Sequence, residues 1–130
     1  MRNYTNDIFQ QDPKRAYQVT LSVFFRIMDK WNLEHSQQII LLGSPQESLF
    51  QEWLQNKVEN ISDEVLIRIS YILGIYKGLG LIFNKRSQAD SWINKPNKKF
   101  NQLSALEFML NGEIEQLEEV RKYVDRQFGF

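Results

Sequence analysis

Apolar residues recur every three or four positions over most of the chain, which is the spacing of one face of an α-helix. The first run consists of five apolar residues separated by 4, 3, 4 and 3 positions: Tyr17, Leu21, Phe24, Met28 and Trp31. This run predicts a helix that begins at Ala16. Residues 1–15 lack the pattern and contain Pro13, so we expect a mobile or loosely packed arm before the helix.

Two shorter helices are predicted next. The first covers residues 34–42 and ends at Gly43, because glycine readily adopts the left-handed conformation that ends a helix. Ser44 and Glu47, with a proline between them, then have the spacing of a capping box at the start of another helix. We expect this third helix to run to about residue 56. Four of its apolar side chains are expected to face the core: Leu49, Phe50, Trp53 and Leu54.

The second half of the chain predicts further helices. Ser62, followed by two acidic residues, caps a fourth helix that continues to about Phe83. Its apolar residues cover most of the circumference, so it is either the central core helix or part of a subunit interface. A last helix is predicted over residues 113–126, where Glu118 and Lys122 form a favourable pair one turn apart. Because strand-like alternation is almost absent, the predicted fold class is all-α.

Composition narrows the possible functions. The 130 residues include 16 basic and 16 acidic side chains, so the net charge of zero gives no argument for a polyanionic partner. There is no Cys, and one His, His35, is too few for a zinc site. The first fifteen residues are polar, unlike a signal peptide, and the most apolar run, 69–83, is shorter than the roughly 20 residues of a membrane span. We therefore expect a soluble, cytoplasmic protein that uses no metal or other cofactor.

Patterns that would indicate an enzyme are weak. The segment 74–80 contains three glycines but lacks the Gly-Lys-Ser/Thr ending and the preceding strand of a phosphate-binding loop. Close helix packing or a helix break is the better interpretation of these glycines. No spacing pairs Asp90, Glu107 and Asp125 for acid–base chemistry. We expect a protein without catalytic activity.

The two short helices around Gly43 match a helix-turn-helix unit, in which the second helix enters a DNA groove. Its candidate DNA contacts are polar residues: Ser44, Gln46, Ser48 and Gln51. Glu47 and Glu52 lie on the same outward face, which has no base, and carboxylates repel the phosphates that supply most DNA affinity. DNA binding therefore stays open as the weaker alternative.

Charge is unevenly distributed in the last third of the chain. Residues 85–99 carry five bases and one acid, and residues 113–119 carry four acids and no base. Trp92 lies among the bases and Phe100 directly follows them. The basic segment is either a solvated loop or a contact for an acidic protein surface or nucleic acid.

Specific residue successions occur in both halves of the chain. The N-terminal half contains Trp31-Asn-Leu33, Leu41-Leu42-Gly43-Ser44 and Arg68-Ile-Ser-Tyr-Ile-Leu-Gly74-Ile-Tyr-Lys77. The C-terminal half contains Trp92-Ile-Asn-Lys-Pro96-Asn97, Phe100, Ser104-Ala-Leu106-Glu107-Phe-Met109, Gly112 and Val120-Arg121-Lys-Tyr-Val124-Asp125. Together these stretches resemble the Xre/MbcA/ParS antitoxin family over about residues 20–126.

The resemblance implies three segments: a flexible arm over residues 1–15, an Xre-like helix-turn-helix domain over 16–74 and a toxin-binding domain over 75–130. The structural motif of the last domain is expected at five residues: Trp92, Pro96, Asn97, Phe100 and Ser104. This chain has Asn101-Gln102 where the family usually has a glycine pair, and Ala105 where it usually has proline. The turn is therefore expected to differ slightly, while Ser104 still caps the next helix.

The resemblance also implies a function. Members neutralise a RES-domain toxin that consumes NAD⁺ by binding it, and many form homodimers and repress their own operon. The expected toxin contacts are Lys98, Lys99, Arg121, Arg126, Phe128, Gly129 and Phe130. The arginine and aromatic rings of the C-terminal tail are expected to enter the toxin's dinucleotide pocket, with folding back onto the chain's own core as the alternative. A DNA-binding repressor without a cognate toxin is the second functional hypothesis.

Overall fold

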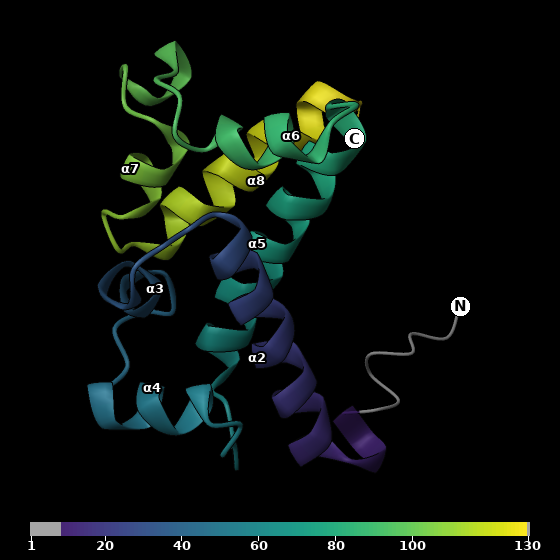
Figure 1. Ribbon diagram of the computed structural model, residues 1–130, viewed down its shortest axis with the longest axis vertical. Helices are drawn as coiled ribbons and strands as arrows, with labels where there is room; N and C mark the ends of the chain where they lie inside the picture. The colour runs from purple at the N-terminus through teal and green to yellow at the C-terminus, as the bar shows by residue number, and fades with distance from the viewer. Residues whose placement is uncertain (1–8, 130) are drawn as a thin grey trace.

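The structure is a computed structural model that describes residues 9–129 and, within them, every side chain except that of Phe128. The regular elements of the described part are all helices, and the loops between them contain one isolated antiparallel bridge, between Pro96 and Ser104. This confirms the predicted all-α fold class. In chain order the elements are α2 (Pro13–Lys30), α3 (His35–Leu41), α4 (Glu47–Leu54), α5 (Asp63–Ile82), α6 (Arg86–Trp92), the 3-10 helix η1 (Lys98–Phe100), α7 (Ala105–Met109) and α8 (Ile114–Phe128) (Figure 1).

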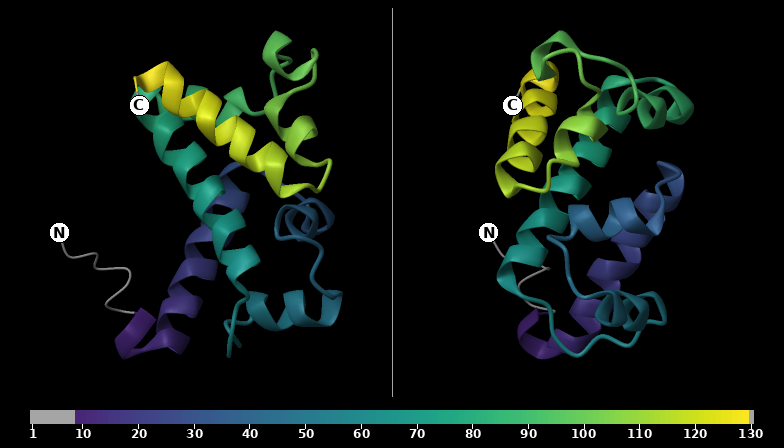
Figure 2. Two further views of the ribbon diagram at one scale, coloured as in Figure 1. Left: turned by 180° about the vertical axis from the view of Figure 1, so that it is seen from behind. Right: turned by 90° about the vertical axis from the view of Figure 1, so that its left-hand side faces the viewer.

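Helix α5 is the element shared by both halves of the molecule. Helix α2 packs along it beside α3 and α4, whereas α6 and α8 pack around its other end, with α7 against α8 (Figures 1 and 2). Its inward residues are fully or almost fully buried: Ile69, Ile72, Ile75 and Leu79. Of the two interpretations from the sequence, the structure therefore supports a central core helix.

The length of α5 corrects one argument from the sequence. The helix has 20 residues, longer than the apolar run of residues 69–83, so by length and composition alone it could cross a membrane. A core helix of a water-soluble protein passes the same test. In this fold α5 contacts α2, α6 and α8, which accounts for its apolar circumference.

Two glycines let α8 approach α5 closely. A Cβ on Gly78 would lie 2.5 Å from Val124 Cγ1, and a Cβ on Gly74 would overlap the guanidinium group of Arg121. Real Cβ atoms do not occur at such distances. The prediction that the glycine-rich segment serves close helix packing is therefore confirmed.

Helix α2 begins within the segment expected to be an arm. Residues 9–11 are helical, and Asp12 caps α2 by accepting a 3.2 Å hydrogen bond from the backbone N–H of Arg15. Pro13 occupies the first helical turn, where its missing N–H costs nothing. The helix thus starts three residues earlier than predicted, because Asp-Pro acts as a helix start signal and not as a breaker.

The predicted capping box at Ser44 is wrong. Ser44 has φ +60°, and the left-handed backbone at Gly43 and Ser44 ends α3. An N-cap residue needs an extended backbone, so Ser44 cannot cap α4, which instead begins at Glu47 after Gln46 without a side-chain cap bond. The expectation that Leu49 faces the core is also wrong, since its side chain is 39% exposed.

Arg68 is the charged residue that connects the two halves, and the sequence analysis missed this role. Its side chain is buried inside the fold, donates to the carbonyl oxygens of Leu41 at 3.4 Å and Gly112 at 2.9 Å, and pairs with Glu64 at 3.3 Å. Leu41 ends α3 and Gly112 precedes α8. The boundary predicted between residues 74 and 75 thus falls inside α5, in a chain whose halves share a helix and a buried arginine.

Candidate toxin-binding surface

The C-terminal half is built around an aromatic cluster: Trp92, Phe100, Phe108 and Tyr123. The rings of Trp92 and Tyr123 stack at 6.0 Å, and those of Phe100 and Phe108 stack at 4.9 Å. Phe100 is buried at the centre, where it also meets Tyr123 edge to face at 5.4 Å. The cluster fixes the loop between α6 and α7 onto α8, which is the structural role expected for Trp92 and Phe100.

Hydrogen bonds from Asn97 shape that loop. Its side chain accepts from the N–H of Lys99 at 2.9 Å, and its own N–H donates to the carbonyl of Leu103 at 3.0 Å. The turn that follows has two consecutive residues in the left-handed region, Asn101 at φ +55° and Gln102 at φ +71°. Glycine adopts this conformation without steric cost, so the chain keeps at these two positions the backbone that suits the family's glycine pair.

Ser104 caps α7, as the sequence predicts. Its hydroxyl accepts from the N–H of Glu107 at 3.0 Å, and the Glu107 carboxylate accepts from the N–H of Ser104 at 3.0 Å. The hydrogen bond that the backbone N–H of Ser104 donates to the Glu107 carboxylate, and after it a hydrogen bond from the Ser104 side chain to the same carboxylate, lower the pKa of Glu107. The cap orients the chain that leads to α8.

One polar groove of about 410 Å³ lies on the outer face of α8. Its lining consists of Lys99, Glu115, Gln116, Glu118, Glu119, Lys122 and Arg126. Two of the predicted toxin contacts, Lys99 and Arg126, are therefore brought together. Lys122 and Glu118 pair at 2.8 Å, and this hydrogen-bonded pairing lowers the pKa of Glu118 and raises the pKa of Lys122.

Arg121 lies away from this groove. Its guanidinium donates to Asp125 at 3.2 Å and to the carbonyl oxygen of Ser70 at 3.2 Å, across the surface of α5 that Gly74 leaves open. The side chain is about one third exposed. The structure therefore gives Arg121 a role in holding α8 to α5 that sequence spacing does not reveal.

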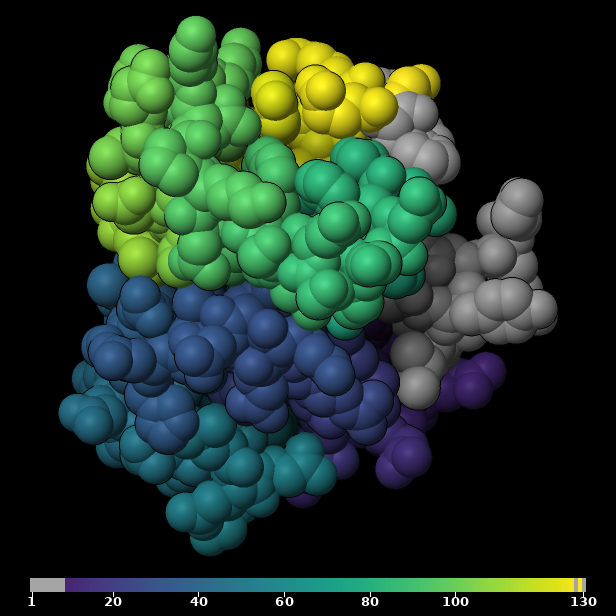
Figure 3. Space-filling model, turned by 45° about the horizontal axis from the view of Figure 1, so that its top comes forward, coloured from purple at the N-terminus to yellow at the C-terminus, as the bar shows by residue number. Residues whose placement is uncertain are grey.

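The remaining predicted toxin contacts lie in η1 and at the C-terminal end of α8. Lys98 is exposed in η1, and Gly129 is exposed with φ +100° as the residue that ends α8. Phe128 is the last residue of α8. Its side chain and all of Phe130 lie outside the described part, so the insertion of their rings into a toxin pocket stays a prediction. The α6–α7 segment and the C-terminal end of α8 form one continuous surface (green and yellow in Figure 3).

The basic segment, expected to be either a solvated loop or a contact surface, contains the helix α6. Arg86 and Asp90 pair at 2.8 Å one turn apart on α6, and the Arg86 guanidinium lies 3.6 Å from the centre of the Tyr76 ring. Arg86 is therefore engaged with α5, whereas Lys85, Lys95, Lys98 and Lys99 are exposed.

The residues predicted to contact DNA form a second candidate surface. Ser44, Gln46, Ser48 and Gln51 are all exposed along the turn and α4, together with Glu47 and Glu52. Phe50 and Trp53 anchor α4 from its inner side. Among the described residues, no group of three or more His, Asp or Glu side chains is arranged to hold a metal ion.

Comparisons with known proteins identify the C-terminal half. Residues 79–129, from the last turns of α5 to the end of α8, match the family model of the antitoxin Xre/MbcA/ParS C-terminal toxin-binding domain. The chain is 41% identical over 109 residues to the uncharacterized protein y4oB of Sinorhizobium fredii, with 84% of each chain covered. No solved structure matches. The chain belongs to the Xre/MbcA/ParS antitoxin family, and residues 79–129 are its toxin-binding domain.

Proposed function

We propose that this protein is the antitoxin of a type II toxin–antitoxin pair, and that it neutralises a RES-domain, NAD⁺-degrading toxin by direct binding. The observation that carries the proposal is the match of residues 79–129 to a toxin-binding domain. The groove on α8, which Lys99 and Arg126 help to line, supports it as a place for a charged partner surface.

The first test uses the tagged, full-length protein to capture its partner from a lysate of its own host. We expect a stoichiometric protein that degrades NAD⁺ once it is separated from the antitoxin. Capture of promoter DNA without a protein would contradict the antitoxin function and support the repressor hypothesis.

The second test locates the contact. Lys99→Glu and Arg126→Glu are expected to weaken toxin capture at least tenfold, because each replaces a favourable charge in the groove by a repulsive one. Lys95→Glu is the matched control, since Lys95 is equally exposed but does not line the groove. Deletion of residues 128–130 tests the tail separately. Full inhibition by the shortened protein would refute insertion of the tail into the toxin's active site.

We further propose that the helix-turn-helix unit gives the protein a second activity, repression of its own operon as a homodimer. Support comes from the exposed polar residues of α4 and its buried anchors Phe50 and Trp53, an arrangement that suits a recognition helix. Titration of its own promoter fragment at several salt concentrations tests this. Affinity that falls steeply with salt is expected for phosphate contacts, and equal affinity for unrelated DNA would contradict operator recognition.

A further inference from the structure

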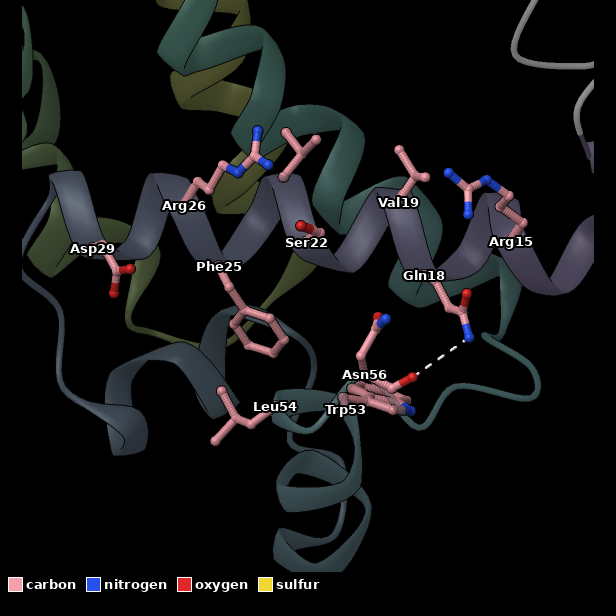
Figure 4. A pocket seen from close by; sticks show the side chains of 11 residues that line it. Arg15, Gln18, Val19, Ser22, Phe25, Arg26, Asp29, Trp53, Leu54 and Asn56 are labelled. Atoms are coloured by element: carbon pink, nitrogen blue, oxygen red, sulfur yellow. Dashed lines mark hydrogen bonds between the residues drawn. The ribbon is translucent and has the colours of Figure 1, made fainter.

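A groove of about 470 Å³ lies between α2 and the end of α4, outside the toxin-binding half (Figure 4). Its floor includes Trp53 and Leu54, and its long wall is the outward face of α2. Eight residues of α2 line this wall, namely Val23 and the seven that carry the argument that follows: Arg15, Gln18, Val19, Ser22, Phe25, Arg26 and Asp29.

The order of these residues is symmetric about Ser22. Arg15 and Asp29 each lie seven positions from Ser22, on opposite sides. Seven residues make about two helical turns, or about 10 Å, so the three residues follow one line along the helix. Gln18 and Arg26 lie four positions away on either side, and Val19 and Phe25 lie three positions away. Two copies of α2 that cross antiparallel at Ser22 would place each residue near its mirror position in the other copy.

The line carries a positive charge at Arg15 and a negative charge at Asp29. Among the described residues, neither the Arg15 side chain nor the Asp29 side chain forms an ion pair, and both residues are exposed. In an antiparallel pair, Arg15 of each copy would face Asp29 of the other. The same contact would therefore occur twice, as two-fold symmetry requires.

The crossing point suits close approach between helices. Ser22 is small and exposed, so two helix backbones can approach each other there. Beside it, Val19 is 45% exposed, and Phe25, which also lines the groove, is partly exposed. Covering these side chains supplies the apolar core that an interface needs between its charged ends.

We propose that this face of α2 binds a second copy of the same chain, in a two-fold antiparallel dimer centred on Ser22 and closed by two Arg15–Asp29 ion pairs. The inference rests on the proposed homodimer and specifies its surface. A second copy fits better than nucleic acid, because it would pair both Arg15 and Asp29, whereas a phosphate backbone would pair Arg15 and Arg26 but be repelled by the Asp29 carboxylate.

The test reverses one charge at a time in the full-length protein. In Arg15→Asp and in Asp29→Arg, both symmetric contacts become repulsive, so we expect the dimer dissociation constant to rise at least about tenfold. Sedimentation equilibrium over a concentration series measures it. The double variant Arg15→Asp/Asp29→Arg restores opposite charges at both contacts, and we expect its dissociation constant to return towards that of the native chain.

Mixing the two single variants gives the sharpest result. An Arg15→Asp chain paired with an Asp29→Arg chain has attractive charges at both contacts, so the two are expected to form a heterodimer more tightly than either variant forms a homodimer. Lys95→Asp is the matched control on an exposed lysine outside α2 and should leave the dimer unchanged. Unaltered circular dichroism of each variant shows that the fold is intact.

The remaining outcomes overturn the inference in distinguishable ways. A native chain that stays monomeric contradicts the homodimer and this surface, while toxin capture tests the antitoxin function independently. A dimer that persists unchanged in both single variants leaves the homodimer in place and refutes this surface. Loss of promoter binding in Arg15→Asp without any change in oligomeric state identifies DNA, and not a second copy, as the occupant of the groove.

Discussion

Helices α2–α4 and helices α6–α8 pack on different parts of α5, but they are held together in different ways. The N-terminal helices pack through an apolar core in which Phe25 meets Phe24 and Phe50 edge to face; Asp12 caps α2, whereas α4 starts without a side-chain cap. The C-terminal helices pack through the four-ring aromatic cluster, and their connecting loop is shaped by the Asn97 hydrogen bonds and the Ser104–Glu107 cap. Side-chain hydrogen bonds thus fix the loop geometry of the C-terminal half, which is the half that matches a family model.

The largest expected effect compares one buried phenylalanine from each half. Phe50→Ala and Phe100→Ala each remove a ring that is at most 1% exposed, at a cost of about 3–5 kcal/mol of the free energy of unfolding. Because both halves share α5, we expect each variant to unfold in one transition. Urea unfolding followed by circular dichroism and by tryptophan fluorescence tests this. Two separate transitions in either variant would mean that the halves fold independently.

The next effect tests the contact between α5 and α8. Gly78→Ala is expected to lower the free energy of unfolding by about 1–3 kcal/mol, because Val124 is buried and cannot move away from the new methyl group. Gly74→Ala meets the Arg121 guanidinium instead, which can turn outward into solvent. We expect the Gly74 variant to lose less stability, as measured by urea unfolding. Equal losses would show that Arg121 is held as rigidly as Val124.

Loss of the α7 cap should cost less. Ser104→Ala removes the hydroxyl that accepts from the Glu107 N–H and is expected to cost about 1 kcal/mol of the free energy of unfolding. Since the pKa of Glu107 is lowered in the folded state, its contribution is complete above the pKa of an unfolded glutamate and is lost as pH falls through the lowered value. Thermal midpoints measured against pH should therefore fall less steeply in acid for Glu107→Gln than for the native chain. Identical pH profiles would contradict a stabilising role for the ionised carboxylate.

The smallest effect concerns the left-handed turn after η1. Gln102→Gly is expected to raise the free energy of unfolding by about 0.5 kcal/mol. It removes the strain of a side chain at φ +71°, but the larger backbone entropy that glycine loses on folding offsets part of this gain. Asn101→Gly should change stability less, since asparagine tolerates this region better than glutamine. Thermal unfolding of the two variants compares them directly. A larger gain at position 101 would contradict this account.

Local signals in the sequence predict much of the fold. Gly43, Ser62 and Ser104 mark helix ends that the structure confirms, because each acts through its own neighbouring backbone. Ser44 fails as a cap because a second left-handed residue follows Gly43, and the residue type alone does not reveal this. Helix α6 was missed because it has seven residues and is held by the Arg86 contacts with Asp90 and Tyr76.

The candidate site is predicted less completely. Lys99 and Arg126 lie together because η1 folds against α8, an arrangement that helical spacing does not contain. Arg121 is a residue type that commonly contacts partners at the surface. Its guanidinium instead binds the carbonyl of Ser70, beside Gly74, which lies 47 positions before Arg121 in the chain. Arg68 escaped attention for the same reason, since both carbonyl groups that it binds come from distant segments.

The shared helix α5 also limits how such antitoxins can be recombined. A chimera that joins the first half of one relative to the second half of another at residue 83 would carry one parent's α5 and the other parent's α8. Gly74 and Gly78 would then face side chains that were not selected to fit them, and Arg68 would meet a foreign turn at position 112. Under the proposed function, an exchange of toxin specificity without loss of the fold would keep the inward face of α8 and replace only its outer, groove-lining face. Packing and partner contact would then be changed separately, one helix face at a time.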